Sequence, residues 1–392
     1  MNRVEEWVLE NKGKIEKGVE ILGQSFEVLA ATVGKLHPIL EAVFVASAEL
    51  LSNPDGKEAK YLTEQFEIIN QKLEGIQHEI DKIALKMQRT SMNKQNFDSE
   101  AQMISQYENF QEFVNAKSNF KEKKKEMFLS HYKNTNGDLN IDALYNAVLG
   151  ENTSGDPMLY TVVSTEQRSR RAVEEFCARL KKLFVMGIIA VMGHAALKDG
   201  AVGGAMVKKW QDRMEEVENR IKAAVDECIE NFPKQAEEDV DNQFKEGQGS
   251  VNPEFTSFIL DSLSKKYDWV FWSVRVIKPG GWFFWNWLAG KKYQGIGGGG
   301  NFFDLTKNDI RIVVSFSSDP KPLNKSQLLE QIECQKMTGN MVSVAQTLCG
   351  SLPNTVVHAV SRYKNVEEKN NFQPECYYFG IHKKAYFCIH SE

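Results

Sequence analysis

The chain has 392 residues, 42% of them hydrophobic and 26% charged, values typical of a globular protein large enough for two or three domains. Its 48 basic and 53 acidic side chains give a net charge of −5, which argues against a general nucleic-acid-binding protein. The N-terminal Met-Asn-Arg-Val-Glu-Glu-Trp is too polar for a secretory signal, and no run of about 18 apolar residues indicates a conventional membrane-spanning helix. Together with six scattered cysteines, this favours a cytoplasmic protein with reduced thiols over an exported protein with three disulfides.

Apolar residues follow a 4-3-4-3 spacing in two stripes, from Ile15 to Val43 and from Leu62 to Met87. This period keeps one apolar seam facing a partner helix, as in coiled coils. Pro38 is expected to kink or end the first helix. The second stripe is weakened at Thr90 and Lys94 and then resumes, so we predict a single helix of roughly 40 residues or more. The spacing leaves open whether the partner helix belongs to the same chain or to a homo-oligomer.

Polar clusters over Lys133–Pro157 predict loops around a short helix. A third helix is expected to start near Ser164, and a fourth, with heptad spacing, to end by Pro233. The acidic, polar segment from Gln235 to Val251 is interpreted as an interdomain connection.

Beyond residue 254, short runs of β-branched and aromatic residues bounded by Pro, Gly and Asp are typical of strands. The strands are expected at Trp269–Ile277, Ile310–Phe316, Val356–Val360, Cys376–Ile381 and Ala385–His390, and helices at Ser326–Met337 and Val342–Leu348. The predicted fold class is therefore mainly α. A long-helix bundle with an apolar helical hairpin occupies residues 1–235, and a smaller aromatic-rich α+β domain occupies residues 254–392.

The stretch from Leu183 to Leu197 is apolar and uncharged, and after a turn at Lys198-Asp199-Gly200 the chain returns over Ala201–Val207. A helix that is apolar all round lies in a protein core or in lipid, and its glycines suit close helix contact, as in membrane helix pairs. One interpretation is a bundle core, because the stretch is too short to span a bilayer unaided; the other is a stored membrane-inserting hairpin. The candidate membrane-insertion residues are Leu183, Phe184, Val185, Met186, Gly187, Ile188, Ile189, Val191, Met192, Gly193, His194, Leu197, Gly203 and Gly204. His194 is either a satisfied core histidine or a trigger whose protonation loosens the hairpin.

Five of the seven tryptophans lie between residues 269 and 287. Amphipathic rings favour sites with one dry and one wet end, such as a protein interface or lipid headgroups. The alternative is an aromatic core with a few exposed rings. The candidate interface or lipid-surface residues are Trp269, Trp272, Trp282, Phe283, Phe284, Trp285 and Trp287.

Motifs that would indicate an enzyme are weak. The G-x-G-x-x-G at Gly295–Gly300 precedes Asn-Phe-Phe-Asp rather than a helix, so we predict a mobile surface loop instead of a phosphate site. Cys376, His382, Cys388 and His390 share a predicted hairpin, but their spacing fits no closed zinc site, and an ordinary hairpin is expected. We expect no catalytic residues, no metal and no cofactor.

Several strings along the chain carry a family resemblance. They are Leu36-His-Pro-Ile39, Ala46-Ser-Ala-Glu-Leu-Leu51, Tyr267-Asp-Trp-Val-Phe-Trp-Ser-Val-Arg275, Gly299-Gly-Asn-Phe-Phe-Asp304, Val357-His-Ala-Val360 and His382-Lys-Lys-Ala-Tyr386. With the long heptad helix and the apolar hairpin, they cover most of the chain and resemble the rapunzel family of bony fish, which is similar to cephalotoxin-type proteins. The resemblance implies a role in skeletal or fin growth and a helical domain like that of an α-helical pore-forming toxin. It supplies no catalytic residues, and the missing secretory signal and Cys-rich modules argue against cytolysis.

Two functions follow. The first is a non-enzymatic regulatory or scaffold protein of the cytoplasm that binds protein partners through its helices and aromatic surface. The second is a latent membrane-active, pore-forming-like protein at the membrane periphery, whose hairpin 183–207 inserts into lipid. They differ in whether the hairpin is enclosed by other helices and whether it is ever released. Protein partners are expected, membrane lipid and a homo-oligomer are alternatives, and nucleic acid is not expected.

Overall fold

The structure is a computed structural model that describes residues 9–10, 12–14, 16, 56–81, 92–150, 156–199, 203–246, 253–278, 293–307, 310–337 and 339–392. The chain divides into two units, Met1–Ile229 and Glu230–Glu392, which we call the helical unit and the sheet unit. Each is described by itself. The first predicted stripe, from Ile15 to Val43, and Pro38 within it lie outside the described residues.

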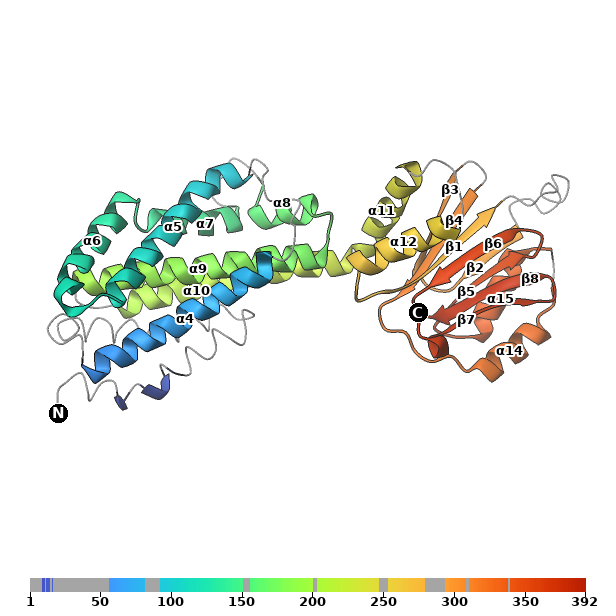
Figure 1. Cartoon of the computed structure of the whole chain (residues 1–392). Helices are drawn as coiled ribbons and strands as arrows, with labels where there is room; N and C mark the ends of the chain where they lie inside the picture. The colour runs from blue at the N-terminus through green and yellow to red at the C-terminus, as the bar shows by residue number, and fades with distance from the viewer. Residues whose placement is uncertain are drawn as a thin grey trace. The chain divides into compact units, whose positions relative to one another are not determined.

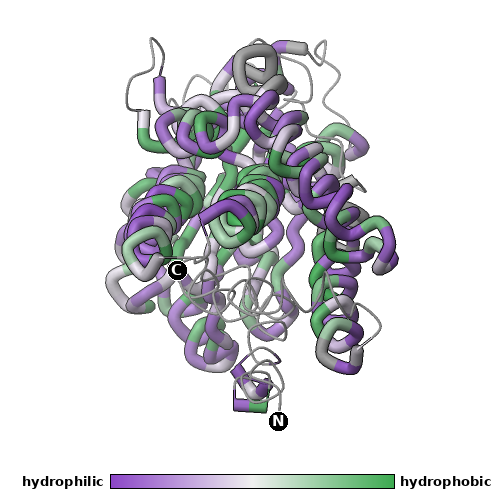
Figure 2. The backbone as a smooth tube through the Cα atoms, turned by 90° about the vertical axis from the view of Figure 1, so that its left-hand side faces the viewer, coloured by the Kyte–Doolittle hydropathy of each residue, from purple (hydrophilic) through white to green (hydrophobic). Residues whose placement is uncertain are grey.

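The helical unit is built around one continuous hydrophobic core. Its helices are α4 (Lys57–Asp81), α5 (Met92–Val114), the short 3-10 helix η1 (Ser118–Phe120), α6 (Lys121–Asn134), α7 (Leu139–Leu149), α8 (Met158–Thr165), α9 (Arg170–Asp199) and α10 (Gly204–Glu230) (Figure 1). The tube in Figure 2 alternates between hydrophilic and hydrophobic residues along most helices, as expected of amphipathic helices around a shared core. The heptad residues Leu62, Phe66, Ile69 and Leu73 of α4 are buried in this core, so the described part of that seam packs within the chain.

The prediction of one helix continuing through the second stripe was wrong. The rings of Phe66 on α4 and Phe110 on α5 lie 5.6 Å apart, and the Thr63 hydroxyl is 3.4 Å from the Val114 carbonyl oxygen. In a single straight helix these residues would be separated by roughly 65 Å or more, because each residue adds about 1.5 Å. The chain therefore reverses between α4 and α5. Helix α5 contributes Met103, Tyr107 and Phe110 to the shared core, whereas Ala101 of the predicted seam is exposed.

The sheet unit has four layers, in which helices cover the outer faces of two antiparallel sheets (Figure 1). The first sheet has the order β3-β4-β1-β6, with bounds Phe302–Lys307, Ile310–Ser317, Phe271–Lys278 and Asn365–Asn370. The second has the order β2-β5-β8-β7, with bounds Gln294–Gly297, Thr355–Ser361, Ala385–Ser391 and Tyr377–His382. Helices α11 (Phe232–Glu246) and α12 (Pro253–Lys266) share a core with the first sheet, and α14 (Lys325–Cys334) and α15 (Met341–Ser351) share one with the second. The short 3-10 helix η3 (Pro374–Cys376) leads into β7. The predicted class, a helix bundle followed by a smaller α+β unit, is confirmed.

The predicted interdomain connection from Gln235 to Val251 is instead largely helix α11. Phe232, Ala236, Val240 and Phe244 recur every four residues and bury one stripe of this short helix in the core under the first sheet. The segment looked like a linker because its other positions are polar.

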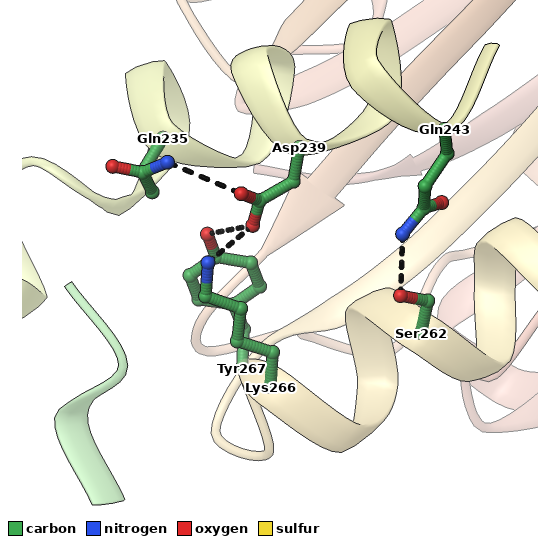
Figure 3. A network of polar contacts seen from close by, with 6 residues as sticks. All are labelled: Gln235, Asp239, Gln243, Ser262, Lys266 and Tyr267. Atoms are coloured by element: carbon green, nitrogen blue, oxygen red, sulfur yellow. Dashed lines mark hydrogen bonds and ion pairs between the residues drawn. The ribbon is translucent and has the colours of Figure 1, made fainter. Parts of the chain in front are cut away.

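Polar contacts fasten α11 to α12 (Figure 3). The Asp239 carboxylate accepts hydrogen bonds from the Tyr267 hydroxyl at 2.8 Å, the Lys266 ammonium at 2.5 Å and the Gln235 amide at 3.1 Å. Farther along, the Gln243 amide lies 2.6 Å from the Ser262 hydroxyl. Helix α11 therefore belongs to the fold of the sheet unit.

The predicted mobile loop at Gly295–Gly300 is partly a strand. Gly295 and Gly297 lie in β2, which pairs with β5 and packs under α15. A Cβ atom on Gly295 would lie 2.3 Å from the Val342 Cα atom, so only glycine fits where the helix backbone approaches the strand. The turn that follows uses Gly298 at φ +119°, a conformation that favours glycine. These glycines serve packing and turning, with no helix following to hold a phosphate.

Candidate functional site

Helix α9 is the most unusual element of the helical unit. Every residue from Leu183 to Leu197 is buried except His194, which is half-buried. Among the described residues, α9 is the one helix long and apolar enough to cross a membrane by length and composition, and 89% of its most apolar window is buried. A helix buried on all sides needs no polar face, which explains how an uncharged sequence is tolerated in the middle of the bundle.

The surrounding helices enclose α9 closely; we call α4, α5, α6, α7 and α10 the sheath. A Cβ atom on Gly193 would lie 2.5 Å from the Phe110 ring of α5, and one on Gly187 would lie 2.8 Å from the Ile141 side chain of α7. Phe110 also packs against Phe128 of α6, with ring centroids 5.3 Å apart. Gly187 and Gly193 therefore let the sheath approach the backbone of α9, as predicted for these two of the four glycines in the hairpin.

Ion pairs join the helices of the bundle outside the apolar stretch of α9. Lys181 on α9 lies 3.1 Å from Glu218 on α10, with side chains only 9% and 17% exposed. Further ion pairs join Arg179 of α9 to Glu100 of α5 and Arg213 of α10 to Asp142 of α7. Partly buried pairs are costly to break when one partner is removed, so these contacts act as locks on the sheath.

His194 lies where α6 covers the C-terminal half of α9. Its ring stacks on Tyr132 with centroids 4.2 Å apart and 20° between the planes, and the Tyr132 hydroxyl donates a 2.5 Å hydrogen bond to Asp138. Burial lowers the pKa of His194 and the charge of Lys198 lowers it further, while Asp138 and Asp199 oppose the shift. The neutral ring is thus the form that suits this stacked, half-buried position.

The returning arm of the predicted apolar hairpin differs from the prediction. Gly203 and Gly204 are exposed, and a Cβ atom on either would meet nothing within 4 Å. Helix α10 begins at Gly204 and is amphipathic, with Val207, Trp210 and Met214 facing the core. One arm, the stretch of α9 from residue 183 to 197, is therefore buried apart from half-buried His194. The other presents a polar face to solvent because charged residues begin at Lys208.

The two described tryptophans of the aromatic stretch pack inside the sheet unit. Trp272 is fully buried, 5.9 Å from Phe232 and 5.4 Å from Phe316 between ring centroids. Trp269 is half-buried and meets Phe232 edge-on at 6.0 Å. Trp269 and Trp272 therefore belong to the core of the sheet unit, as in the interpretation of this stretch as an aromatic core. The remaining candidates lie outside the described residues; they are Trp282, Phe283, Phe284, Trp285 and Trp287.

A polar layer between the two sheets was not predicted. Arg275 of β1 is fully buried and donates to the Ser315 hydroxyl at 2.7 Å and to the Cys388 sulfur at 2.6 Å. Ser315 lies 2.7 Å from Nε2 of His390, whose Nδ1 lies 2.7 Å from the Ser391 carbonyl oxygen. A carbonyl only accepts, so Nδ1 carries the proton and Nε2 accepts from the Ser315 hydroxyl. Ser273 and Arg275 alternate with valines in β1, a signal that a polar face exists.

The polar layer is sealed rather than open. Burial lowers the pKa of His390 to about 3; the hydrogen bond to Ser391 opposes the shift and the charge of Arg275 adds to it. Cys388 and His390 of the hairpin face the first sheet through Arg275 and Ser315. The predicted hairpin, formed by β7 and β8, is confirmed. Within the described ranges, no group of three or more His, Cys, Asp or Glu residues could hold a metal ion. The layer fixes how the two sheets stack.

A family model matches the helical part of the chain. Residues 52–249 match the cephalotoxin-like middle helical domain, which covers just over half of the chain and ends shortly after α11. Protein rapunzel of Danio rerio is 23% identical over 219 residues, which are 55% of this chain and 95% of that protein. No solved structure matches the chain.

Proposed function

The chain belongs to the cephalotoxin-like family, and on that premise we propose that its helical unit is a non-enzymatic, latent membrane-active module that stores α9 until lipid replaces the sheath. The observation that carries the proposal is α9 itself, an enclosed helix with the length and composition to cross a membrane.

The energetics of α9 restrict where it can go. Nine large apolar side chains lie between Leu183 and Leu197. Exposing them to water would cost on the order of 20 kcal/mol, at about 1.5–3 kcal/mol each. Whole domains are stable by only about 5–15 kcal/mol. Helix α9 can therefore leave the sheath only for another apolar environment, and a bilayer provides one.

Lysines on both sides of the apolar stretch of α9 compensate for its short length. Lys181 and Lys182 precede it and Lys198 follows it. Long lysine side chains reach the headgroup region while their stems lie in the apolar layer. From Lys181 to Lys198 the helix measures roughly 26 Å, against a hydrocarbon core of about 30 Å, a mismatch that local thinning accommodates.

Content release from anionic vesicles tests the proposal, with the full-length protein and two variants. Glu218→Gln removes a lock on α9 and is expected to accelerate release several-fold. Asp212→Asn removes an exposed pair on α10 with Lys208 and is the matched control, expected to behave as the unmodified protein. No release by any of the three proteins at pH 7 or pH 5 would remove the proposal.

Protein-partner binding, the function that the sequence favoured, is the second candidate. One observation supports it, a groove of about 560 Å³ between α8 and α10. Its floor includes Leu159, Val163 and Ala224, and Tyr160 at its edge is exposed. Sedimentation of the full-length protein and of Tyr160→Glu tests whether the groove serves self-association. A dimer lost in the variant would support it, and a monomer in both would count against it.

A further inference from the structure

The outer face of α6 combines exposed apolar side chains with a lysine. Phe120, directly before α6, is 51% exposed, and Met127 is 44% exposed. Lys123 lies between them at spacings of three and four residues, so the three side chains share one face of the helix. The opposite face, with Phe128 and Tyr132, is buried against the rest of the bundle.

The same segment is strongly basic in a chain whose net charge is −5. Between residues 117 and 133 there are six lysines and two glutamates. Lys121 is buried and donates to the Phe113 and Val114 carbonyl oxygens at the end of α5, and two others form ion pairs with Glu112 and Glu122. No residue that the structure describes forms an ion pair with the other three, which are Lys117, Lys123 and Lys133.

We propose that this α6 outer face, formed by Phe120, Lys123 and Met127 with Lys117 and Lys133 beside them, is a docking surface for an anionic lipid bilayer. Lysines near a bilayer are attracted by negative headgroups, and exposed Phe and Met side chains enter the boundary between headgroups and acyl chains. A convex helical face that carries exposed apolar side chains among lysines matches the negative charge and the apolar boundary of a flat, deformable lipid surface.

The position of α6 adds weight to the proposal. It lies at the end of the helical unit where α9 ends and α10 begins (Figure 1). Lys198 and Lys209 are exposed on either side of that turn, and Lys208 forms an exposed ion pair with Asp212. The α6 outer face therefore lies at the same end of the helical unit as the connection between α9 and α10.

Docking through α6 would act directly on the stored helix. The inner face of α6 supplies Tyr132, which stacks on His194, and Phe128, which packs on Phe110 beside Gly193. Lipid contact that draws α6 outward therefore weakens the contacts that cover α9. The inference rests on the proposed function, because it names the surface that reaches lipid first.

Flotation of the full-length protein tests the docking surface, using vesicles of phosphatidylcholine with phosphatidylserine and vesicles of phosphatidylcholine alone. Binding is expected to the first and to be lost in high salt. Phe120→Ser, Met127→Ser and Lys123→Glu each change an exposed side chain, and circular dichroism is expected to show the helix content of the unmodified protein. Lys123→Glu is expected to lower the partition coefficient about tenfold or more, since the substitution changes the charge by two units and each unit near the surface contributes about 1 kcal/mol.

Two matched controls separate a local effect from a general one. Phe258→Ser removes an exposed ring from α12 of the sheet unit, and Lys222→Glu reverses an exposed charge on α10. Both are expected to float as the unmodified protein does. Equal flotation of the α6 variants would overturn the proposal. So would binding of soluble polyglutamate with the same residue dependence but no flotation, which would assign the face to an acidic protein.

The outcomes also separate this inference from the proposed function. Flotation that depends on the α6 residues, without content release, would retain the docking surface and contradict the release of α9. Content release that is unaffected by the α6 substitutions would retain the stored helix and contradict the docking surface.

Discussion

Gly187 and Gly193 illustrate how two similar glycines on one helix have different importance. An added Cβ atom at Gly193 would press on the ring of Phe110, which neighbouring aromatic rings hold in place. At Gly187 it would meet the flexible end of Ile141, which can shift. The sequence predicted close packing at both positions, but only the structure distinguishes a rigid neighbour from a yielding one.

We expect Gly193→Ala to destabilise the helical unit by about 1–3 kcal/mol, because overpacking outweighs the gain in helix propensity. Gly187→Ala should change stability by less than about 1 kcal/mol. Gly203→Ala, where nothing lies within 4 Å, serves as the unhindered control. Urea unfolding of the full-length protein measures all three, and equal stability of Gly193→Ala and Gly203→Ala would contradict the close contact.

His194 gives the sheath a pH dependence with a definite sign. Its pKa in the folded protein is lowered by burial and by Lys198, so the unfolded chain binds the extra proton more readily. The stability that the neutral ring contributes is complete above the unfolded pKa of about 6.5 and is lost as the pH falls below it. The protection factor of the α9 amides, which is the intrinsic exchange rate at each pH divided by the observed rate, is therefore expected to fall between pH 7 and pH 5, and to fall less in His194→Gln. An equal fall in both proteins would assign the acid response to other groups.

At the scale of elements, the lock between α9 and α10 should matter more than an exposed pair. Glu218→Gln leaves the Lys181 charge largely buried, and we expect a loss of about 2–4 kcal/mol. Asp212→Asn breaks the exposed pair with Lys208 and should cost less than about 0.5 kcal/mol. Thermal unfolding followed by circular dichroism compares the two, and similar losses would show that the lock has no special role.

Elements with a strong local pattern were predicted well, and elements defined by distant contacts were not. The apolar stretch of α9, the heptads of α10 and the β7–β8 hairpin follow from their own residues. The reversal of the chain between α4 and α5 could not be predicted from the sequence pattern, because a heptad seam has the same spacing on either side of a turn. Strands β2, β3 and β6 were missed because glycines and charged residues hide their pairing, and α11 because only four of its positions are apolar.

The candidate site was predicted in part. The apolar residues of α9 were identified because an uncharged stretch stands out in any sequence. The contribution of the sheath, such as Phe110 against Gly193 and Glu218 beside Lys181, depends on tertiary packing that no local pattern reveals. The α6 outer face was overlooked because lysines on a helix usually mark a solvated face; its exposed Phe120 and Met127 become informative only once burial is known.

At the scale of the whole molecule, the sheet unit should fold by itself when α11 is included. Its cores draw all their residues from Phe232 onward. A fragment of residues 230–392 is therefore expected to unfold cooperatively. A fragment of residues 254–392 lacks the four buried apolar residues of α11 and should be less stable by several kcal/mol or aggregate. Urea unfolding compares the stability of the two fragments. Equal stability would show that α11 is a linker and contributes nothing to the fold of the sheet unit.

Release of α9 to lipid is the central claim, and peptide-resolved hydrogen exchange with anionic vesicles measures it most directly. With vesicle-bound protein, we expect α4 and α5 to exchange faster than in solution, because their partner has left, while α9 stays protected by its own hydrogen bonds within the bilayer. Unchanged protection of α4, α5 and α9 in protein that floats with the vesicles would contradict the claim and identify α9 as a permanent core helix.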